Sequence, residues 1–282
     1  FVVTTQAYRK FIAQIASKIY PDLKQLDVED NDKLQALAKS IQELIIKTEM
    51  QQELQDEIIE AYEALDTKDM LSQDHPFVAV RSSANAEDGP EASFAGQNAT
   101  YLNIKGKQKV LAAVKACWAS LFTARSIYYR TKNNFNHTKV FIAVVVQEMV
   151  DSEKAGVMFS VNPVTQKPNE IMIEATYGLG ESVVSGAITP DEYVVDKNSE
   201  EILTRNIVKK TWMFTKDPEK GETIKADVSK DIQEKESLQE HEVKILAQLA
   251  KKIEDHYGKP QDMEYAINKG RIFIVQSRPI TT

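Results

Sequence analysis

Residues 78–97 read Val-Ala-Val-Arg-Ser-Ser-Ala-Asn-Ala-Glu-Asp-Gly-Pro-Glu-Ala-Ser-Phe-Ala-Gly-Gln, a short apolar strand that runs into a long loop of small residues. The valines end a predicted buried strand, and strands commonly deliver ligand-binding groups at such ends. Because the loop side chains are small, backbone N–H groups can approach an anion closely, and the Arg81 guanidinium can bind it through two hydrogen bonds. The stretch therefore predicts a phosphate site, with a surface loop and a structural arginine as the alternative. The residues expected to line this site are Arg81, Ser82, Ser83, Ser93 and Gly96.

This loop carries neither of the two common nucleotide-binding motifs. It contains no Gly-x-x-x-x-Gly-Lys-Ser/Thr sequence and no Gly-x-Gly-x-x-Gly sequence after a strand. A nucleotide bound here would therefore be held by a different architecture.

Composition limits the classes of function. The chain has 282 residues, of which 27% are charged and 42% hydrophobic, and a net charge of −7. This excess of negative charge predicts no general attraction for nucleic acid or for an anionic membrane. The single Cys117 excludes an intrachain disulfide framework, and no signal peptide or apolar run of transmembrane length is evident. A cytoplasmic location is expected.

The N-terminal half is predicted to be mainly helical. Apolar residues at helical spacing predict helices at 4–20 with Pro21 following, at 31–65 as a hairpin broken near 48–51, and at 107–131. In the last of these, Arg125 and Arg130 fall outside the apolar stripe. Short strands are expected to end at Arg81 and to cover 101–104.

The C-terminal half is predicted to be rich in strands. A polar, Asn-rich stretch at 132–139 is the expected hinge, so the predicted domains are 1–136 and 137–282. Strands are expected at 140–149, 156–161, 171–175, 192–196, 201–207 and 211–214, a solvated insertion at 216–240 and a helix at 242–257. The predicted class is α+β with two lobes.

Residues 261–278 form the clearest local pattern, a predicted β-hairpin. A three-residue loop at 268–270, with Gly270 in the left-handed conformation, would pair Ile267 with Arg271. Because side chains alternate along strands, one face would then be apolar. The residues predicted on that face are Met263, Tyr265, Ile267, Phe273 and Val275.

The opposite face of this hairpin would be polar, with Asp262, Glu264, Gln276 and Arg278 together. Two carboxylates and an amide suit Mg²⁺ bound together with substrate phosphates, and Arg278 can neutralise the charge of a phosphoryl group in transfer. The alternative is a solvent-exposed face whose ion pair contributes at most about 1 kcal/mol. A two-residue turn would shift the pairing by one residue. Gln276 and Arg278 would then lie on the opposite face from Asp262 and Glu264, and the predicted site would be lost.

The sequence contains three further features that bear on possible sites. The segment Gln147-Glu148-Met149-Val150 ends the longest apolar strand, where backbone groups can read the edge of a purine. The sequence Gly178-Leu-Gly-Glu181 predicts a turn into a short helix that could meet an anion. The four histidines, His75, His137, His241 and His256, follow no metal or triad spacing and are expected to be ordinary surface or capping residues.

These stretches, in this order, resemble the nucleotide-binding domain of the phosphoenolpyruvate synthase (pyruvate, water dikinase) family, which pyruvate phosphate dikinases and rifampicin phosphotransferases share. The resemblance covers essentially the whole chain. It rests on Val80-Arg-Ser-Ser-Ala-Asn-Ala-Glu-Asp88, Ala92-Ser-Phe-Ala-Gly-Gln97, Trp118-Ala-Ser-Leu-Phe-Thr-Ala-Arg125, Gly156-Val-Met-Phe-Ser160, Tyr177-Gly-Leu-Gly-Glu181, Thr189-Pro190 and Val275-Gln-Ser-Arg-Pro279.

The resemblance implies an ATP-grasp-type fold with ATP between two lobes. In that family the domain passes the β-phosphoryl group of ATP to a histidine on a separate swivelling domain, which carries it to pyruvate in a third domain. The same resemblance implies roles for single residues. Arg81 and Arg125 would hold phosphates, residues 147–150 would lie along the adenine, and Glu264, Gln276 and Arg278 would serve metal, nucleotide and phosphoryl group, with Asp262 and Glu181 assisting.

Two departures from the family pattern limit what this chain is expected to do alone. The glycine-rich start with its phosphate-binding lysine is missing, and no Thr-Ser-His acceptor motif occurs. The phosphohistidine and pyruvate-binding domains are therefore expected elsewhere in the same polypeptide. Two rival functions stay open at this point, an antibiotic phosphotransferase with another acceptor and a non-catalytic module that senses nucleotide.

Overall fold

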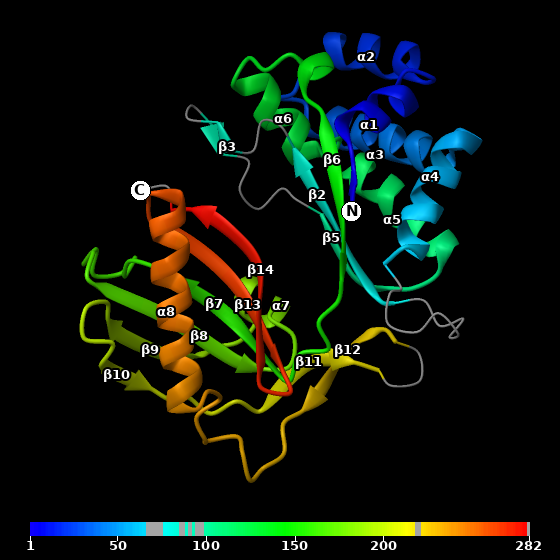
Figure 1. Ribbon diagram of the computed structural model, residues 1–282. Coiled ribbons are helices and arrows are strands. Elements are labelled where there is room, and N and C mark those ends of the chain that lie inside the picture. The colour runs from blue at the N-terminus through cyan, green and yellow to red at the C-terminus, as the bar shows by residue number, and fades with distance from the viewer. Residues whose placement is uncertain (66–75, 85–87, 90–91, 94–98, 218–220, 281–282) are drawn as a thin grey trace. The chain divides into compact units, whose positions relative to one another are not determined.

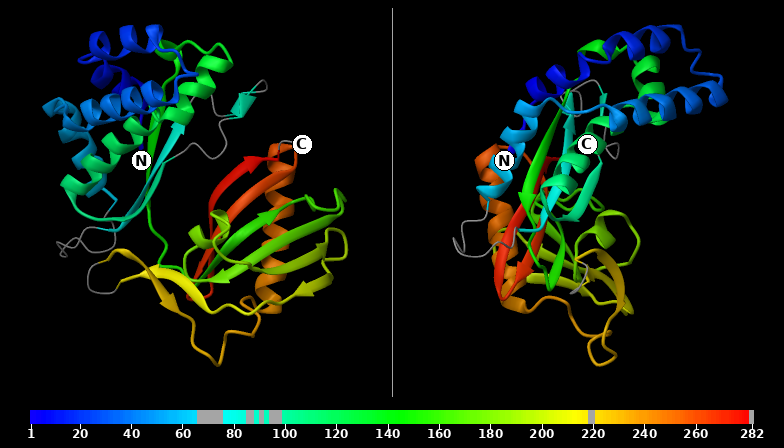
Figure 2. Two further views of the ribbon diagram at one scale, coloured as in Figure 1. Left: turned by 180° about the vertical axis from the view of Figure 1, so that it is seen from behind. Right: turned by 90° about the vertical axis from the view of Figure 1, so that its right-hand side faces the viewer.

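The computed structural model describes residues 1–65, 76–84, 88–89, 92–93, 99–217 and 221–280. The chain divides into two compact units, Phe1–Met149 and Val150–Thr282, each built from helices and antiparallel strands (Figures 1 and 2). The α+β class predicted from the sequence is confirmed. The division follows Met149, whereas the sequence predicted it after residue 136.

The position of this division is explained by strand pairing in unit 1. Its sheet has four strands in the order β1 (Val2–Val3), β6 (Ile142–Glu148), β2 (Val78–Ala84) and β5 (Thr100–Ile104). Strand β6 pairs with β2 without interruption, from Val78 opposite Glu148 to Ala84 opposite Ile142. The strand predicted to open the second lobe is therefore a central strand of the first.

The helices of unit 1 are α1 (Thr5–Ile12), α2 (Ala16–Gln25), α3 (Asn31–Lys47), α4 (Gln52–Glu63), α5 (Lys107–Ser120) and α6 (Ala124–Lys132), with a short 3₁₀ helix at His137–Lys139. The predicted helical hairpin at 31–65 is confirmed as α3 and α4. The first predicted helix is two helices, and Pro21 lies inside α2 with its ring exposed, not after a helix end.

The helix predicted at 107–131 is also broken, at residues 121–123. Thr123 starts α6 because its Oγ1 accepts a hydrogen bond from the Ser126 N–H at 3.2 Å. The break shifts the helical phase, so Arg130, predicted outside the apolar stripe, is 1% exposed. The segment Lys107–Lys132 is long and apolar enough to cross a membrane by length and composition. Most of it is buried in the unit 1 core, and buried core helices pass the same test.

Unit 2 is a six-stranded antiparallel sheet with one long helix against it. The strand order is β10 (Ile202–Asn206), β9 (Asp191–Asp196), β8 (Glu170–Tyr177), β7 (Lys154–Phe159), β13 (Gln261–Asn268) and β14 (Arg271–Pro279). Helix α8 (Glu240–Tyr257) lies against one face (Figure 1), where its apolar side chains join Met158, Tyr193, Met263 and Tyr265 in the core. The face of the sheet opposite α8 is therefore the one that can carry a binding site.

The chain between β10 and α8 carries more structure than the sequence predicted. Strands β11 (Trp212–Lys216) and β12 (Thr223–Asp227) form a two-stranded sheet, and Val228 and Leu238 are buried. The predicted solvated insertion at 216–240 holds for most of its described residues, which are exposed or half-buried, but 223–227 form β12 and Val228 and Leu238 join the buried residues. Helix α7 (Glu181–Val184) follows β8, as the glycine turn predicted. Two short strands, β3 (Asp88–Gly89) and β4 (Ala92–Ser93), pair with each other.

Candidate functional site

The β13–β14 hairpin differs from its prediction at the turn. Asn268 pairs with Arg271, so the turn has two central residues, Lys269 and Gly270, with φ values of 48° and 73°. Positive φ at both positions is the signature of a type I′ hairpin turn, which matches the twist of the flanking strands. The predicted three-residue loop is wrong. Near the turn the core-facing residues of β14 are consequently Ile272 and Ile274, in place of Phe273 and Val275.

A β-bulge restores the predicted polar face farther along the hairpin. Tyr265 pairs with Ile274 but the adjacent Glu264 pairs with Gln276, so one extra residue is inserted in β14. The extra residue again changes which residues of β14 face the core, and this offsets the change made by the shorter turn. Glu264 therefore lies opposite Gln276, and Asp262 lies opposite Arg278, on the face away from Met263 and Tyr265. The predicted grouping holds, although the predicted cross-strand partners were wrong.

Asp262 and Arg278 form an ion pair on this face. The Arg278 Nε donates a hydrogen bond to the Asp262 Oδ2 at 2.8 Å. The Asp262 side chain is 16% exposed and that of Arg278 is 46% exposed. Because Arg278 remains accessible, the pair contributes at most about 1 kcal/mol to stability. The ion pair also holds the Arg278 guanidinium on the face of β13 and β14 that carries Glu264.

Two more carboxylates lie in the same row, and sequence reasoning missed both. Glu264 pairs with Val157 of β7, Val157 with Glu174 of β8, and Glu174 with Glu192 of β9. Burial raises the pKa of Glu174, and the negative charges of Glu192 and Asp262 raise it further. This face of the sheet is therefore acidic, and an anionic ligand would need a cation with it.

The donor set fits Mg²⁺ that is bound together with phosphates. Glu264 and Gln276 offer carboxylate and amide oxygens from directly paired positions. Within the residues that the structure describes, no three or more Asp, Glu, His or Cys side chains gather closely enough to hold a metal. Mg²⁺ commonly takes one or two carboxylates, several waters and substrate phosphates, so this face suits a metal that arrives with a nucleotide.

In unit 1, Arg81 and Ser82 lie in β2. Arg81 is half-buried and pairs with Val145 and with Thr100. The Ser82 Oγ accepts a hydrogen bond from the Ala99 N–H at 2.8 Å, and the Ser82 N–H donates to the Ala99 carbonyl at 2.9 Å. These two bonds tie the chain before the loop to the chain after it.

The other predicted loop residues are less fully described. Ser83 is exposed at the end of β2, and Ser93 lies in β4 with its side chain outside the described residues. Gly96 also lies outside the described part of the chain. The phosphate loop therefore stays a prediction.

Arg125 is exposed in the first turn of α6. Backbone N–H groups at the start of a helix carry partial positive charge, which favours anions beside them. Arg125 and the helix start would therefore attract the same kind of group. This arrangement is compatible with the predicted phosphate role.

The predicted adenine segment, 147–150, crosses the division between the units. Gln147 pairs with Ala79 and Glu148 with Val78, and the Met149 N–H donates to the Phe77 carbonyl at 2.8 Å. Val150 is the first residue of unit 2, where its carbonyl accepts from the Ser152 N–H at 2.9 Å. The purine role of this segment stays a prediction.

The glycine turn before α7 is fixed by close backbone contacts. Gly178 has a φ of 76°, and a Cβ placed on it would lie 2.2 Å from the Phe214 carbonyl oxygen. The Leu179 N–H donates to that same carbonyl at 2.8 Å. The turn therefore requires glycine, and it presents Glu181 as an exposed residue at the start of α7.

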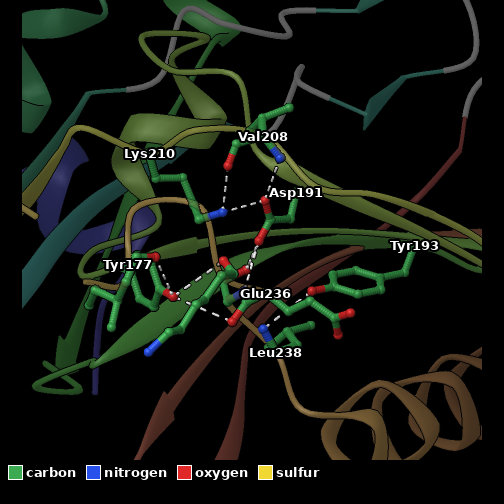
Figure 3. A network of polar contacts seen from close by, with 10 residues as sticks. Tyr177, Asp191, Tyr193, Val208, Lys210, Glu236 and Leu238 are labelled. Atoms are coloured by element: carbon green, nitrogen blue, oxygen red, sulfur yellow. Dashed lines mark hydrogen bonds and ion pairs between the residues drawn. The ribbon is translucent and has the colours of Figure 1, made fainter. Parts of the chain in front are cut away.

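A buried ion pair near this turn was not predicted. Lys210 Nζ donates to the Asp191 Oδ1 at 2.5 Å and to the Val208 carbonyl at 2.8 Å, while the Asp191 Oδ2 accepts from the Ser237 N–H and hydroxyl (Figure 3). Both charged side chains are almost wholly buried. Figure 3 also shows Tyr177 beside this network. The pair joins β9 to the segments before β11 and before α8, so its role is to anchor the β11–β12 hairpin.

One histidine differs from its prediction. His137 is half-buried, and its Nδ1 accepts a hydrogen bond from the Arg130 Nε at 3.1 Å. Burial lowers the pKa of His137 to about 4, and the Arg130 charge adds to the effect. His241 and His256 are exposed as predicted, and His75 lies outside the described residues.

Comparison with known proteins identifies a family. The family profile described as pyruvate phosphate dikinase, AMP/ATP-binding domain, matches residues 1–282. A probable phosphoenolpyruvate synthase of Methanocaldococcus jannaschii is 51% identical over 100% of this chain and 24% of its own length. One from Methanothermobacter thermautotrophicus is 49% identical over 100% of the chain and 41% of its length. The phosphoenolpyruvate synthase of Pyrococcus furiosus is 49% identical over 92% of the chain and 32% of its length. The chain thus spans a quarter to two fifths of these relatives.

Proposed function

Since the chain belongs to the family of pyruvate phosphate dikinase AMP/ATP-binding domains, we propose that it is the part of a phosphoenolpyruvate synthase that binds ATP and releases its β-phosphoryl group. The group passes to a histidine on a separate domain of the same polypeptide and then to pyruvate. The overall reaction is ATP, pyruvate and water to AMP, phosphoenolpyruvate and phosphate. The names of relatives 49–51% identical to this chain support this assignment.

The proposed architecture is of the ATP-grasp type, with the two units as its lobes and ATP between them. Two observations support it. Each unit has its own core and an antiparallel sheet. The residues expected to bind the nucleotide are also divided between the units, with Arg81 and Arg125 in the first and Glu264 and Arg278 in the second.

In this proposal the two units contribute different chemistry. Arg81 and Arg125 bind the phosphates through charge-assisted hydrogen bonds. Glu264 and Gln276 hold Mg²⁺, which neutralises phosphate charge when bound. Arg278 stabilises the charge of the phosphoryl group in transfer, and Asp262 orients its guanidinium.

The acidic row on unit 2 adds a specific expectation. Glu174 and Glu192 lie in the row of paired positions that contains Glu264. Their charges repel free ATP and favour its complex with a divalent cation. ATP affinity should therefore depend steeply on Mg²⁺, and less steeply in a Glu174→Gln variant. Calorimetric titration with ATP, with and without Mg²⁺, measures this difference.

The single observation that carries the proposal is the polar face formed by Asp262, Glu264, Gln276 and Arg278. Phosphoryl transfer is catalysed mainly by positioning and charge, so removing one such group costs about 10²–10³ in rate. Glu264→Gln and Arg278→Ala should lower AMP formation in the full-length protein by this factor.

Matched controls separate the site from general effects of lost charge. Glu234 is 74% exposed and forms an ion pair with Lys209, and Arg205 forms exposed ion pairs on the surface. Glu234→Gln and Arg205→Ala should keep the wild-type rate. Full activity of both site variants would overturn the assignment. Normal ATP binding without any turnover in the wild type would instead favour a nucleotide sensor.

We place the protein in the cytoplasm, with the domains that carry the acceptor histidine and bind pyruvate as its partners. The single Cys117 is a buried free thiol, which is compatible with a reducing compartment. Fractionation of cells with an antibody against the protein tests the location.

A further inference from the structure

Arg130 is a buried cation that the proposed reaction does not use. The residue is 1% exposed in α6, and within the described part of the chain no carboxylate is among its hydrogen-bond partners or neighbouring titratable groups. Its Nη1 donates to the Leu121 carbonyl at 2.5 Å and its Nε donates to His137 Nδ1 at 3.1 Å. The Cζ lies 5.6 Å from the centre of the Phe122 ring. The Nη2 has no hydrogen-bond partner among the described residues.

An arginine in this position is costly. Removing a guanidinium from water without a carboxylate to compensate it opposes folding, and burial lowers the pKa of Arg130 to about 10. Part of the cost is offset because the Leu121 carbonyl stands at the C-terminal, negative end of α5. A methionine would fill a similar volume at lower cost. The contacts of the guanidinium therefore indicate what the residue is for.

Those contacts fix the corner between α5 and α6. The Leu121 carbonyl belongs to the three residues that separate the two helices, and Thr123 caps α6 immediately afterwards. Helix α6 has only 9 residues, too few for stability without tertiary contacts. One guanidinium thus ties the start of α6 to His137 beyond its end. Arg125 lies in the first turn of the helix held in this way.

We propose that Arg130 is a positioning residue for Arg125: by holding the Leu121 carbonyl, it fixes the start of α6 and so the place from which Arg125 reaches a phosphate. The inference rests on the proposed function, in which Arg125 binds ATP. Arg130 itself, inside the core, touches no nucleotide.

A double-mutant cycle in the full-length protein tests the inference. The probe is the non-hydrolysable ATP analogue AMP-PNP with Mg²⁺, and the readout is its Kd by calorimetry. Arg125→Ala should weaken binding about 10- to 100-fold, as expected for a lost charge-assisted hydrogen bond. Arg130→Lys keeps the charge but cannot bridge two acceptors in fixed geometry, and it should weaken binding about tenfold. The double variant should bind no more weakly than Arg125→Ala alone.

Arg81 provides the matched control for the cycle. It lies on strand β2 and belongs neither to α6 nor to the three residues that precede it. Arg130→Lys should therefore weaken binding by the same factor in an Arg81→Ala background as in the wild type. A merely structural role of Arg130 would act equally in both backgrounds and would not vanish with Arg125→Ala.

A second variant keeps the test decisive if Arg130→Lys does not fold. Thr123→Ala removes only the cap of α6. The equilibrium constant for forming the first turn of that helix should then fall about tenfold. It should also weaken binding, and only while Arg125 is present. Losses that add to that of Arg125→Ala, for Arg130→Lys or for Thr123→Ala, overturn the inference, and so does normal binding by both of these variants. Normal binding by Arg125→Ala itself overturns instead the phosphate role proposed for Arg125.

Discussion

His137 makes unit 1 sensitive to acid, and the geometry gives the sign of the effect. Arg130 Nε can only donate, so the His137 Nδ1 that it contacts must be unprotonated. The other ring nitrogen then carries the proton, which it donates to Thr131 Oγ1 at 3.2 Å. Protonation of Nδ1 would set two donors and two positive charges against each other. The folded protein therefore resists protonation of His137.

The size of the effect follows from the shift in pKa. The pKa of His137 falls from 6.5 in the unfolded chain to about 4 in the folded protein. As pH decreases, the unfolded state takes up the proton first, so stability is complete above about pH 6.5 and is lost progressively down to about pH 4. The full shift corresponds to about 3 kcal/mol. Because His137 is only half-buried, solvent screening reduces the expected loss to about 1–2 kcal/mol.

The assay is urea unfolding at a series of pH values between 7.5 and about 4.5. Trp118 is buried in unit 1, and a Trp212→Phe background leaves its fluorescence as the only tryptophan signal. His137→Gln keeps an acceptor for Arg130 but removes the titration, so its stability should change less with pH than that of the wild type.

His241→Gln, on the exposed surface of α8, is the control and should follow the wild-type curve. Carboxylates also titrate below pH 5, but they contribute equally to all variants. The reasoning is refuted if His137→Gln and the wild type lose stability in parallel between pH 6.5 and 5.

Three more outcomes are expected. Gly156→Ala should destabilise unit 2 by about 2–4 kcal/mol in urea unfolding, because a Cβ would lie 1.8 Å from a main-chain oxygen of β8. Gly180→Ala is the control and should cost under about 1 kcal/mol, because the nearest atom to its Cβ would be 3.4 Å away. Equal costs of the two substitutions would contradict this explanation. Lys210→Met should cost about 3–5 kcal/mol because Asp191 is left buried and unpaired, and adding Asp191→Asn should recover part of that loss. Burial raises the pKa of Cys117 to about 12, so a thiol reagent at pH 8 should label it only after unfolding, and rapid labelling of the folded protein would oppose the assignment.

The polar hairpin face shows how far local pattern extends. Alternation along β13 sets Asp262 and Glu264 on one side whatever the partner strand does. The partners on β14 depend on the turn and on the bulge. The turn is one residue shorter than predicted and the bulge adds one residue, so the two differences cancel for Gln276 and Arg278. The residues were therefore predictable, and their pairing was not.

Arg130 shows the opposite case. A helical wheel drawn through 107–131 places Arg130 outside the apolar stripe, because the wheel assumes an unbroken helix. The break at 121–123 has a local signal in the Thr123 cap of α6, but the burial of Arg130 that follows from it depends on packing of α6 against the unit 1 core. His137 was undervalued for the same reason, since its partner is this arginine.

The sequence by itself determined the elements whose causes are local: the α3–α4 hairpin, the glycine turn before α7, the carboxylates on one side of β13, and a family resemblance carried by contiguous motifs. Only the tertiary structure decided which strands are neighbours. That choice assigned β6 to unit 1 and aligned Glu174 and Glu192 with Glu264. The physical reason is that capping and alternation act within a few residues, whereas strand order and burial are settled by contacts between segments far apart in the chain.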